Sequence, residues 1–246
     1  MKLFLGLLLL VLSHVASKAA EPAYFELRIY DVTTNKLEGV LERFRDAVEP
    51  IRRKHGINTI AYWTASNTNS DKFVYLMTGK TKAAFQQAEK EFGEDPDFKA
   101  AYSASNQKHG KTVDKITSIA LAPSDAKLDL RAAATARAFD LRLYSVNPGK
   151  LEAFSSRWRD HAAPIYERHG MHSIGWWVAE QKDAEGHDVF VCLLAAENLA
   201  AIPKSIAAFH QDEEWQRVEK ETEKDGKLRS GVTAFKLTAA SFSPLK

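Results

Sequence analysis

The fold is decided by the stretch Phe139-Asp140-Leu141-Arg142-Leu143-Tyr144, because the chain contains it twice. A close copy, Phe25-Glu26-Leu27-Arg28-Ile29-Tyr30, lies 114 positions earlier. Aligned without a gap, residues 25–58 and 139–172 are identical at 15 of 34 positions, whereas chance at average residue usage would give roughly two. The sequence therefore indicates an internal duplication, and every other segment has to be interpreted within that repeat.

Each copy of this stretch alternates between apolar and polar residues, which is the period of a β-strand. The residues that follow, 36–55, place their apolar side chains at steps of three and four, and this spacing predicts a helix. Pro50 lacks a backbone donor and is expected to kink or end that helix. The two faces of the first strand are Phe25, Leu27 and Ile29 on one side, and Glu26, Arg28 and Tyr30 on the other.

The remaining segments of the first copy predict two strands, a helical region and a closing strand. The helical region is expected from Lys82, with a further helix starting at Asp95, where the carboxylate can accept from free backbone amides. The second copy repeats this order. Strand, helix, strand, strand, helix, strand is a split βαβ arrangement. The predicted fold class is therefore α+β, with two tandem ferredoxin-like βαββαβ units and the helices on a single face of each sheet.

The first 20 residues differ in kind from the rest. Lys2 precedes an apolar run of ten residues with one glycine, and small residues follow at positions 17–20. This pattern predicts a signal peptide, because ten residues are too few to cross a bilayer. The expected location is secreted or periplasmic, with no membrane association after cleavage. The expected division is a signal peptide at 1–20, domains at 23–122 and 137–246, and a linker at 123–136.

The predicted architecture has a consequence for the polar residues of the first strands. Each sheet would be covered by helices on one face only, so two bare faces would bury each other and form a barrel. Closure within one chain and closure between two chains are both compatible with the sequence. The expected interior residues are Glu26, Arg28 and Tyr30 from one half, and Asp140, Arg142 and Tyr144 from the other. Such buried charges must pair with each other or meet a ligand.

The charge balance excludes one class of partner. Removing Lys2 and Lys18 with the leader leaves 34 − 2 = 32 basic residues against 32 acidic ones. A balanced chain does not attract nucleic acid or anionic lipid, so no nucleic-acid partner is expected. The single cysteine, Cys192, lies in an apolar strand and is expected to be a small buried hydrophobic residue.

No recognisable catalytic motif is present, and this favours a protein that is not an enzyme. HExxH, GxSxG, CxxC and dinucleotide glycine patterns are missing from the sequence. Gly110-Lys111-Thr112 resembles the end of a phosphate loop, but Ser105 stands where that motif needs glycine. His169 and His172 could chelate a metal, yet no carboxylate or thiol accompanies them at ligand spacing. No metal and no cofactor are therefore expected.

A set of candidate ligand-binding residues follows from the doubled strand and from two tryptophans at matching places. Trp63 and Trp177 are expected either to fill the barrel core or to stack against a ligand. Arg28 and Arg142 are expected either to form structural ion pairs or to capture an anionic group. The candidates are Arg28, Tyr30, Trp63, Arg142, Tyr144, His172 and Trp177.

The pattern of the second copy resembles the NIPSNAP family. The resemblance rests on Asn147-Pro148-Gly149-Lys150-Leu151, Trp158-Arg159-Asp160, His169-Gly170-Met171 and Gly175-Trp176-Trp177, and on Asp212 with Trp215. The first copy departs from it at Thr33-Thr34-Asn35, where proline and glycine are missing. The resemblance implies a fold of the dimeric α/β-barrel superfamily. That superfamily includes small-molecule monooxygenases and haem-dependent enzymes, so it supports many chemistries and selects none.

Three functions of different class are compatible with the sequence. The first is a non-catalytic barrel outside the cytoplasm that binds a small organic molecule. The second is a cofactor-independent or haem-using monooxygenase. The third is a protein-interaction module, acting as a homodimer or with another protein partner. Binding and interaction are favoured over catalysis because the residue patterns lack a catalytic constellation.

Overall fold

The computed structural model describes residues 24–65, 71–123, 128–130 and 136–245. The expected signal peptide and most of the expected linker lie outside these residues. The first half consists of β1 (Tyr24–Val32), α1 (Leu37–Arg43), η1 (Phe44–Val48), α2 (Glu49–Lys54), β2 (Asn58–Ala65), β3 (Lys72–Gly79), α3 (Lys82–Glu94), α4 (Pro96–His109) and β4 (Val113–Pro123). The second half consists of β5 (Ala138–Val146), α5 (Leu151–Arg157), η2 (Trp158–Ala162), α6 (Ala163–Arg168), β6 (Met171–Ala179), β7 (Asp188–Ala196), α7 (Ala201–Gln211), α8 (Glu213–Thr222) and β8 (Arg229–Ala239). The predicted order of elements is confirmed in both copies.

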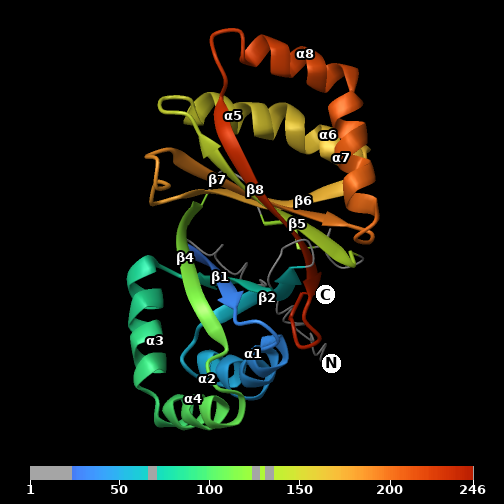
Figure 1. The fold of residues 1–246 in the computed structure, drawn as a ribbon. Helices are drawn as coiled ribbons and strands as arrows, with labels where there is room; N and C mark the ends of the chain where they lie inside the picture. The colour runs from blue at the N-terminus through green and yellow to red at the C-terminus, as the bar shows by residue number, and fades with distance from the viewer. Residues whose placement is uncertain (1–23, 66–70, 124–127, 131–135, 246) are drawn as a thin grey trace, which may run out of the picture.

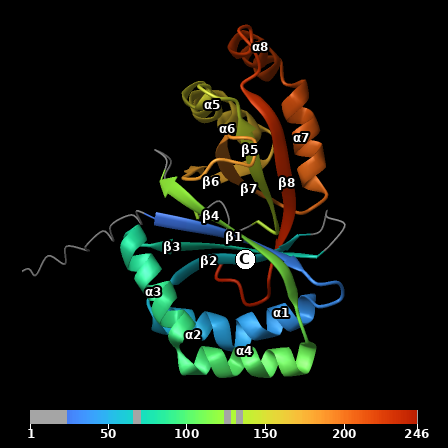
Figure 2. The same cartoon turned by 60° about the vertical axis from the view of Figure 1, so that its left-hand side comes forward.

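The eight strands form one closed antiparallel barrel in the order β1-β3-β2-β8-β5-β7-β6-β4. Two strand pairs join the halves. β2 pairs with β8, where Thr64 lies opposite Thr238, and β4 pairs with β6, where Ala122 lies opposite Val178. Figures 1 and 2 show β4 and β8 running from their own half toward the other, with the helices on the outside. The barrel therefore closes within a single chain.

The barrel interior is apolar, and this corrects the prediction for the first strands. The face that enters the barrel carries Phe25, Leu27 and Ile29, together with the matching Phe139 and Leu141. The opposite face turns toward the helices of the same half, and it carries Glu26, Arg28 and Tyr30 in β1 and Asp140, Arg142 and Tyr144 in β5. The alternation of residues along a strand separates its two faces. It does not show which face packs against the other sheet and which packs against the helices. The sheet-to-sheet layer has few hydrogen-bonding groups, so it takes the aliphatic face.

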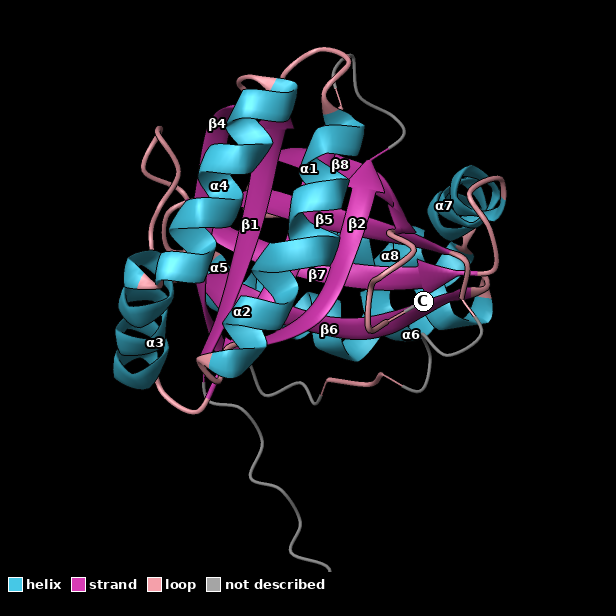
Figure 3. Ribbon diagram, turned by 90° about the horizontal axis from the view of Figure 1, so that it is seen from below, coloured by secondary structure: helices cyan, strands magenta, loops and turns pink. Residues whose placement is uncertain are grey.

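The long helix of each half continues past its proline, which contradicts the expectation that the first of these helices ends at Pro50. In the first half α1, η1 and α2 run without interruption from Leu37 to Lys54, and the segment η1, just before Pro50, is π-helical. The same turn precedes Pro164 in the second half. A π-turn accommodates the missing backbone donor, so the helix bulges instead of ending. Figure 3 shows α1 and α2 lying along the outer face of the first sheet.

No helix in the described ranges has the length and apolarity needed to span a bilayer.

An aspartate caps the last helix of each half and links it to the C-terminal end of α2 in the first half and of α6 in the second. The Asp95 carboxylate accepts from the Asp97 amide, and the Asp212 carboxylate accepts from the amides of Glu214 and Trp215. The ring of His169 lies 2.9 Å from Asp212. This hydrogen bond, together with those from Arg168, lowers the pKa of Asp212 to about 2.

The lowered pKa of Asp212 predicts a specific acid sensitivity. An aspartate with a depressed folded pKa stabilises the protein fully above its unfolded value, about 3.9, and this stabilisation is lost as pH falls through the folded value. The Asp212→Asn variant should therefore have a lower Tm than the wild type at neutral pH. The difference should shrink between about pH 4 and pH 2. Thermal melts followed by circular dichroism test this, with the exposed Asp225→Asn as control. A Tm difference that stays constant with pH would contradict the prediction.

Candidate ligand-binding pocket

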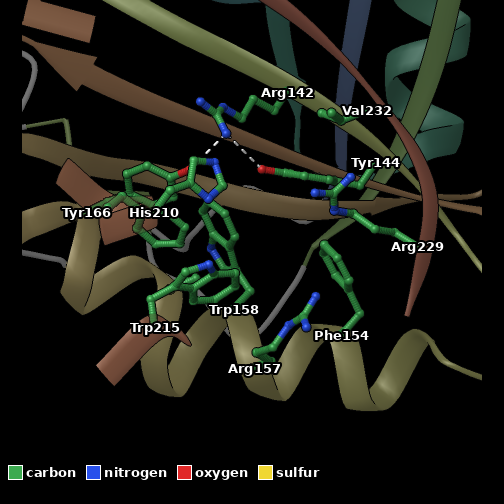
Figure 4. Close-up of a pocket in the computed structure, with 12 residues that line it drawn as sticks. Arg142, Tyr144, Phe154, Arg157, Trp158, Tyr166, His210, Trp215, Arg229 and Val232 are labelled. Carbon is green, nitrogen blue, oxygen red and sulfur yellow. Dashed lines mark hydrogen bonds between the residues drawn. The ribbon is translucent and has the colours of Figure 1, made fainter. Parts of the chain in front are cut away.

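A pocket lies in the second half, between its sheet and its helices. The cavity has a volume of about 90 Å³. Figure 4 shows Arg142 on the sheet side of this space and Arg157, Trp158 and Trp215 on the helix side. Val232 is 44% exposed, and it places one edge of the pocket at the protein surface. The lining residues are Arg142, Tyr144, Phe154, Arg157, Trp158, Ala162, Tyr166, Phe209, His210, Trp215, Arg229 and Val232.

Arg142 is the polar centre of the sheet side. Its Nε donates to Asp140 over 2.6 Å, and its Nη1 donates to the hydroxyls of Tyr166 and Tyr144 over 2.8 and 3.2 Å. Burial raises the pKa of both tyrosines, so each stays a neutral hydroxyl. Burial also raises the pKa of Asp140, and the guanidinium of Arg142 only partly offsets this. The cluster is a preorganised set of charges and hydroxyls at the base of the pocket.

Two further arginines make the pocket electropositive. Arg157 is buried, and its Nη1 donates to Glu223 and Thr222 over 3.0 and 3.1 Å. The guanidinium carbon of Arg229 lies 5.7 Å from the ring centre of Tyr144, a cation–π distance. Within the described residues Arg229 forms no ion pair. Arg142 and Arg157 are paired with Asp140 and Glu223 behind the lining, so the excess positive charge at the cavity is that of Arg229.

Two tryptophans and a histidine complete the helix side. The indole nitrogens of Trp158 and Trp215 are buried and have no hydrogen-bond partner among the described residues. A buried donor without an acceptor is costly, so an acceptor atom in the cavity would be stabilised there. Burial lowers the pKa of His210, and the nearby charge of Arg142 lowers it further. His210 is therefore neutral at pH 7 and carries a basic ring nitrogen.

In the first half, three substitutions place a hydrogen-bonded network where the second half has its pocket. Tyr75 lies opposite Arg28 on the neighbouring strand. In the second half, Cys192 lies at the equivalent position opposite Arg142. The hydroxyl of Tyr75 donates to Tyr30 over 2.9 Å and accepts from Arg52 over 3.2 Å. Arg52 stands where the repeat has Tyr166. In addition, Glu89 pairs with Arg28, which leaves that arginine with two carboxylate partners, Glu26 and Glu89.

The structure brings two of the seven candidate residues into the pocket, Arg142 and Tyr144. Arg28 and Tyr30 belong to the filled network of the first half. Trp63 and Trp177 face the barrel interior, where the remaining space is about 10 Å³, less than a water molecule needs. His172 is 45% exposed in its side chain and pairs with Glu167 at 2.5 Å, so it lies on the surface.

Ten of the twelve pocket residues were missed from the sequence, and the charged or hydrogen-bonding ones among them include Arg157, Tyr166, His210 and Arg229. Tyr166 and His210 differ from their counterparts in the first copy, Arg52 and Gly93. The candidate residues were chosen mainly from features that the two copies share, so residues that differ between the copies were overlooked. Such differences are where one half can acquire a site that the other half does not have. Arg157 matches Arg43 in the first copy. Both lie in a charged stretch of a predicted helix, and that pattern is typical of a solvated surface.

The described residues contain one group with metal-ligand geometry, and it does not include His169 or His172. Asp183, Glu185 and His187 lie together in the loop between β6 and β7, with their ligand atoms within 4.8 Å. Asp183 already accepts from the amides of Glu185 and His187, which is the geometry of a loop turn. The pocket also does not fit haem, because a cavity of about 150 Å³ holds only benzene and this one is smaller.

The fold and the pocket together define a class: a single-chain α/β barrel built from two ferredoxin-like halves, with a ligand-sized cavity under the helices of the second half. The chain belongs to the NIPSNAP family, whose family model matches residues 25–126 and 139–244. No curated protein matches the sequence.

Solved structures agree with this assignment at the level of the fold. A candidate monooxygenase from Fusobacterium nucleatum is 10% identical with a TM-score of 0.57, covering 91% of this chain and 94% of that one. A second candidate monooxygenase, from Lactobacillus acidophilus, is 12% identical with a TM-score of 0.52, covering 89% and 94%. An uncharacterized NIPSNAP domain protein from Burkholderia xenovorans is 17% identical with a TM-score of 0.38, covering 43% of this chain and 99% of that one. At these identities the likeness to the two candidate monooxygenases supports the fold alone and does not identify the chemistry of the site.

Proposed function

We propose that the second half binds a small planar organic anion in the pocket between its sheet and its helices. The observation that carries this proposal is the lining itself: three arginines, two unpartnered indole donors and no carboxylate. An aromatic ring would pack among Phe154, Trp158 and Phe209, while its anionic group would meet Arg229 at the open edge. Arg229 is the best candidate for charge pairing because it has no ion-pair partner within the described chain.

The size of the cavity limits the ligand. A dry cavity of about 150 Å³ holds benzene, and this pocket has about 90 Å³. A single ring would therefore be only partly enclosed, with the rest of the ligand projecting past Val232 into solvent. We expect monocyclic aromatic carboxylates and phenolates to be the best class of ligand.

Arg229→Gln should weaken binding of benzoate or salicylate by about tenfold to a hundredfold, because it removes a charge-assisted hydrogen bond worth about 1.5–3 kcal/mol. Isothermal titration and quenching of tryptophan fluorescence would measure the affinity. Arg217→Gln is the matched control, since Arg217 is exposed on the same half and lines no pocket.

Benzamide provides the second control, since it has the shape of benzoate without the charge. It should bind more weakly than benzoate to the wild type, and equally to wild type and Arg229→Gln. If no aromatic acid binds, or if benzamide and benzoate bind equally, the anion-binding function is wrong.

A second candidate function is cofactor-independent oxygenation, and His210 is the specific observation that favours it. A neutral imidazole at the edge of an aromatic pocket can remove a proton from a phenolic substrate, and the resulting anion would be held by arginine. Oxygen uptake with quinol-type substrates would test this, and His210→Gln should abolish it while leaving benzoate binding intact. Oxygen uptake that is missing in the wild type would eliminate the oxygenase and leave the binding function standing.

We further propose that the protein acts outside the cytoplasm, as a secreted or periplasmic protein. The support is the charged, apolar and small-residue pattern of residues 1–20. Sequencing of the mature N-terminus after expression with the complete leader should find that the leader has been removed. A protein that starts at Met1 in the cytoplasmic fraction would contradict this location.

A further inference from the structure

A second groove with a buried arginine lies on the first half, where α1, α4 and the start of β4 meet. It has a volume of about 240 Å³ and is lined by residues of α1, α4 and the start of β4. Its polar lining includes Arg43, Asn106 and Lys111, next to the ring of Tyr102. No carboxylate lines this groove. It includes the Gly110-Lys111-Thr112 stretch that resembles the end of a phosphate loop, although the rest of that motif is missing.

Arg43 is a buried charge without a protein counter-charge. It is 8% exposed, and among the described residues it forms neither a hydrogen bond nor an ion pair. Its guanidinium forms a cation–π interaction with Tyr102, with the guanidinium carbon 5.1 Å from the ring centre. Burial lowers the pKa of Arg43, but an arginine stays protonated in proteins. A buried charge in this state is costly unless something neutralises it.

The duplication supplies an internal comparison for Arg43. Its counterpart Arg157 is equally buried but donates to Glu223 and Thr222. When the two halves are aligned on the capping aspartates Asp95 and Asp212, Asn106 corresponds to Glu223 and Ser105 corresponds to Thr222. The first half has therefore kept the arginine and lost its acid. The hydroxyl of Ser105 is itself buried and without a partner.

The nearest acids on α1 and η1 are already paired. Glu42 accepts from Lys108 and His109, and Asp46 accepts from Arg45. The carbonyl end of α4 lies beside the groove and by itself disfavours an anion. The full positive charges of Arg43 and Lys111 favour an anion. The side chain of Lys111 is 70% exposed and also forms an ion pair with Asp114. Two full charges outweigh the partial charge of a helix end.

We propose that this groove is an oxyanion site, in which Arg43 binds the phosphate or carboxylate group of a small solute with help from Lys111 and Asn106. The site is independent of the pocket in the second half, and it assigns a function to an arginine that the fold leaves unneutralised. The planar guanidinium suits either oxyanion, because both present two oxygens at the spacing of its donors.

Asn106→Glu tests the proposal by restoring the acid that the second half has kept. In buffer without phosphate or carboxylate, this variant should have a higher Tm than the wild type, because Arg43 gains an internal partner. Inorganic phosphate or acetate should raise the Tm of the wild type saturably, by about 2–4 °C at several times Kd. The same anions should give no saturable rise in Asn106→Glu or in Arg43→Gln. Comparing phosphate with acetate at equal ionic strength shows which oxyanion the site takes.

The design separates this site from other effects of salt. Phosphate stabilises many proteins by exclusion from their surface, and that effect is unsaturable and equal in all variants. Arg229→Gln should keep the full response, which distinguishes this groove from the pocket of the second half. A wild type without a saturable response to either anion would overturn the proposal. A response that persists in both Asn106→Glu and Arg43→Gln would overturn it as well.

Discussion

Replacing Trp63 with alanine should lower the free energy of unfolding by about 3–5 kcal/mol, the cost of removing a large buried aromatic side chain. Trp63 is 1% exposed, and its ring centre lies 5.7 Å from that of Phe139 in the other half of the chain. The residues around it are apolar, so the cavity that the substitution leaves should stay dry. Urea denaturation would measure the loss as a lower midpoint.

Trp63→Phe is the matched control for this experiment. The indole nitrogen of Trp63 is buried and unpartnered, so replacing the indole with a phenyl ring removes an unsatisfied donor while keeping most of the packing. We expect this variant to lose much less stability than Trp63→Ala. Neither variant should change benzoate affinity once folded. If Trp63→Ala kept its stability but lost the ligand, Trp63 would be a ligand-stacking residue instead of barrel core.

Asp140→Ala should destabilise the protein by about 3–5 kcal/mol, because it leaves the guanidinium of Arg142 buried without its carboxylate. The exposed fractions of the Arg142 and Asp140 side chains are 9% and 1%, so solvent does not screen the pair. Arg142 would keep only the hydroxyls of Tyr144 and Tyr166, which are neutral. Equilibrium unfolding at pH 7 tests the expectation.

The double variant Asp140→Leu with Arg142→Met should recover most of this loss. Replacing both members of a buried ion pair with apolar side chains is often close to neutral, whereas removing one member strands the other. Burial already raises the pKa of Asp140, which indicates that keeping this carboxylate ionised inside the protein costs free energy. The recovered protein should still bind benzoate less tightly, because Arg142 lines the pocket. Equal stability of Asp140→Ala and wild type would show that the pair carries no such coupling.

The element order could be predicted from the sequence because local patterns are sufficient for it. The alternation in residues 25–30 and 139–144 specifies strands, and the duplication specifies that the second half repeats the first. The helix after each strand was predicted from its apolar stripe, but its passage through Pro50 was not. A π-turn that absorbs a proline depends on backbone geometry that the stripe does not encode.

The candidate site was predicted only in part, and the reason is visible in the pairs Tyr75 with Cys192 and Glu89 with Ile206. These substitutions decide which half is filled and which is hollow. Each is an unremarkable residue in its own strand or helix. The effect of Tyr75 and Cys192 appears only when the neighbouring strand places them opposite Arg28 and Arg142, and the effect of Glu89 appears only when α3 brings it to Arg28.

The sequence by itself determined that the chain is a duplication, that each copy is a βαββαβ unit and that the family is NIPSNAP. The duplication and the repeating unit follow from internal identity and periodicity, whereas the family follows from the resemblance of its motifs and from the family model. Only the tertiary structure decided that the barrel closes within one chain, that Leu27 and Leu141 point inward, and that the arginines turn toward the helices. Both faces of these strands are buried, so the choice depends on which layer can satisfy a charge, and that is a property of the assembled layers.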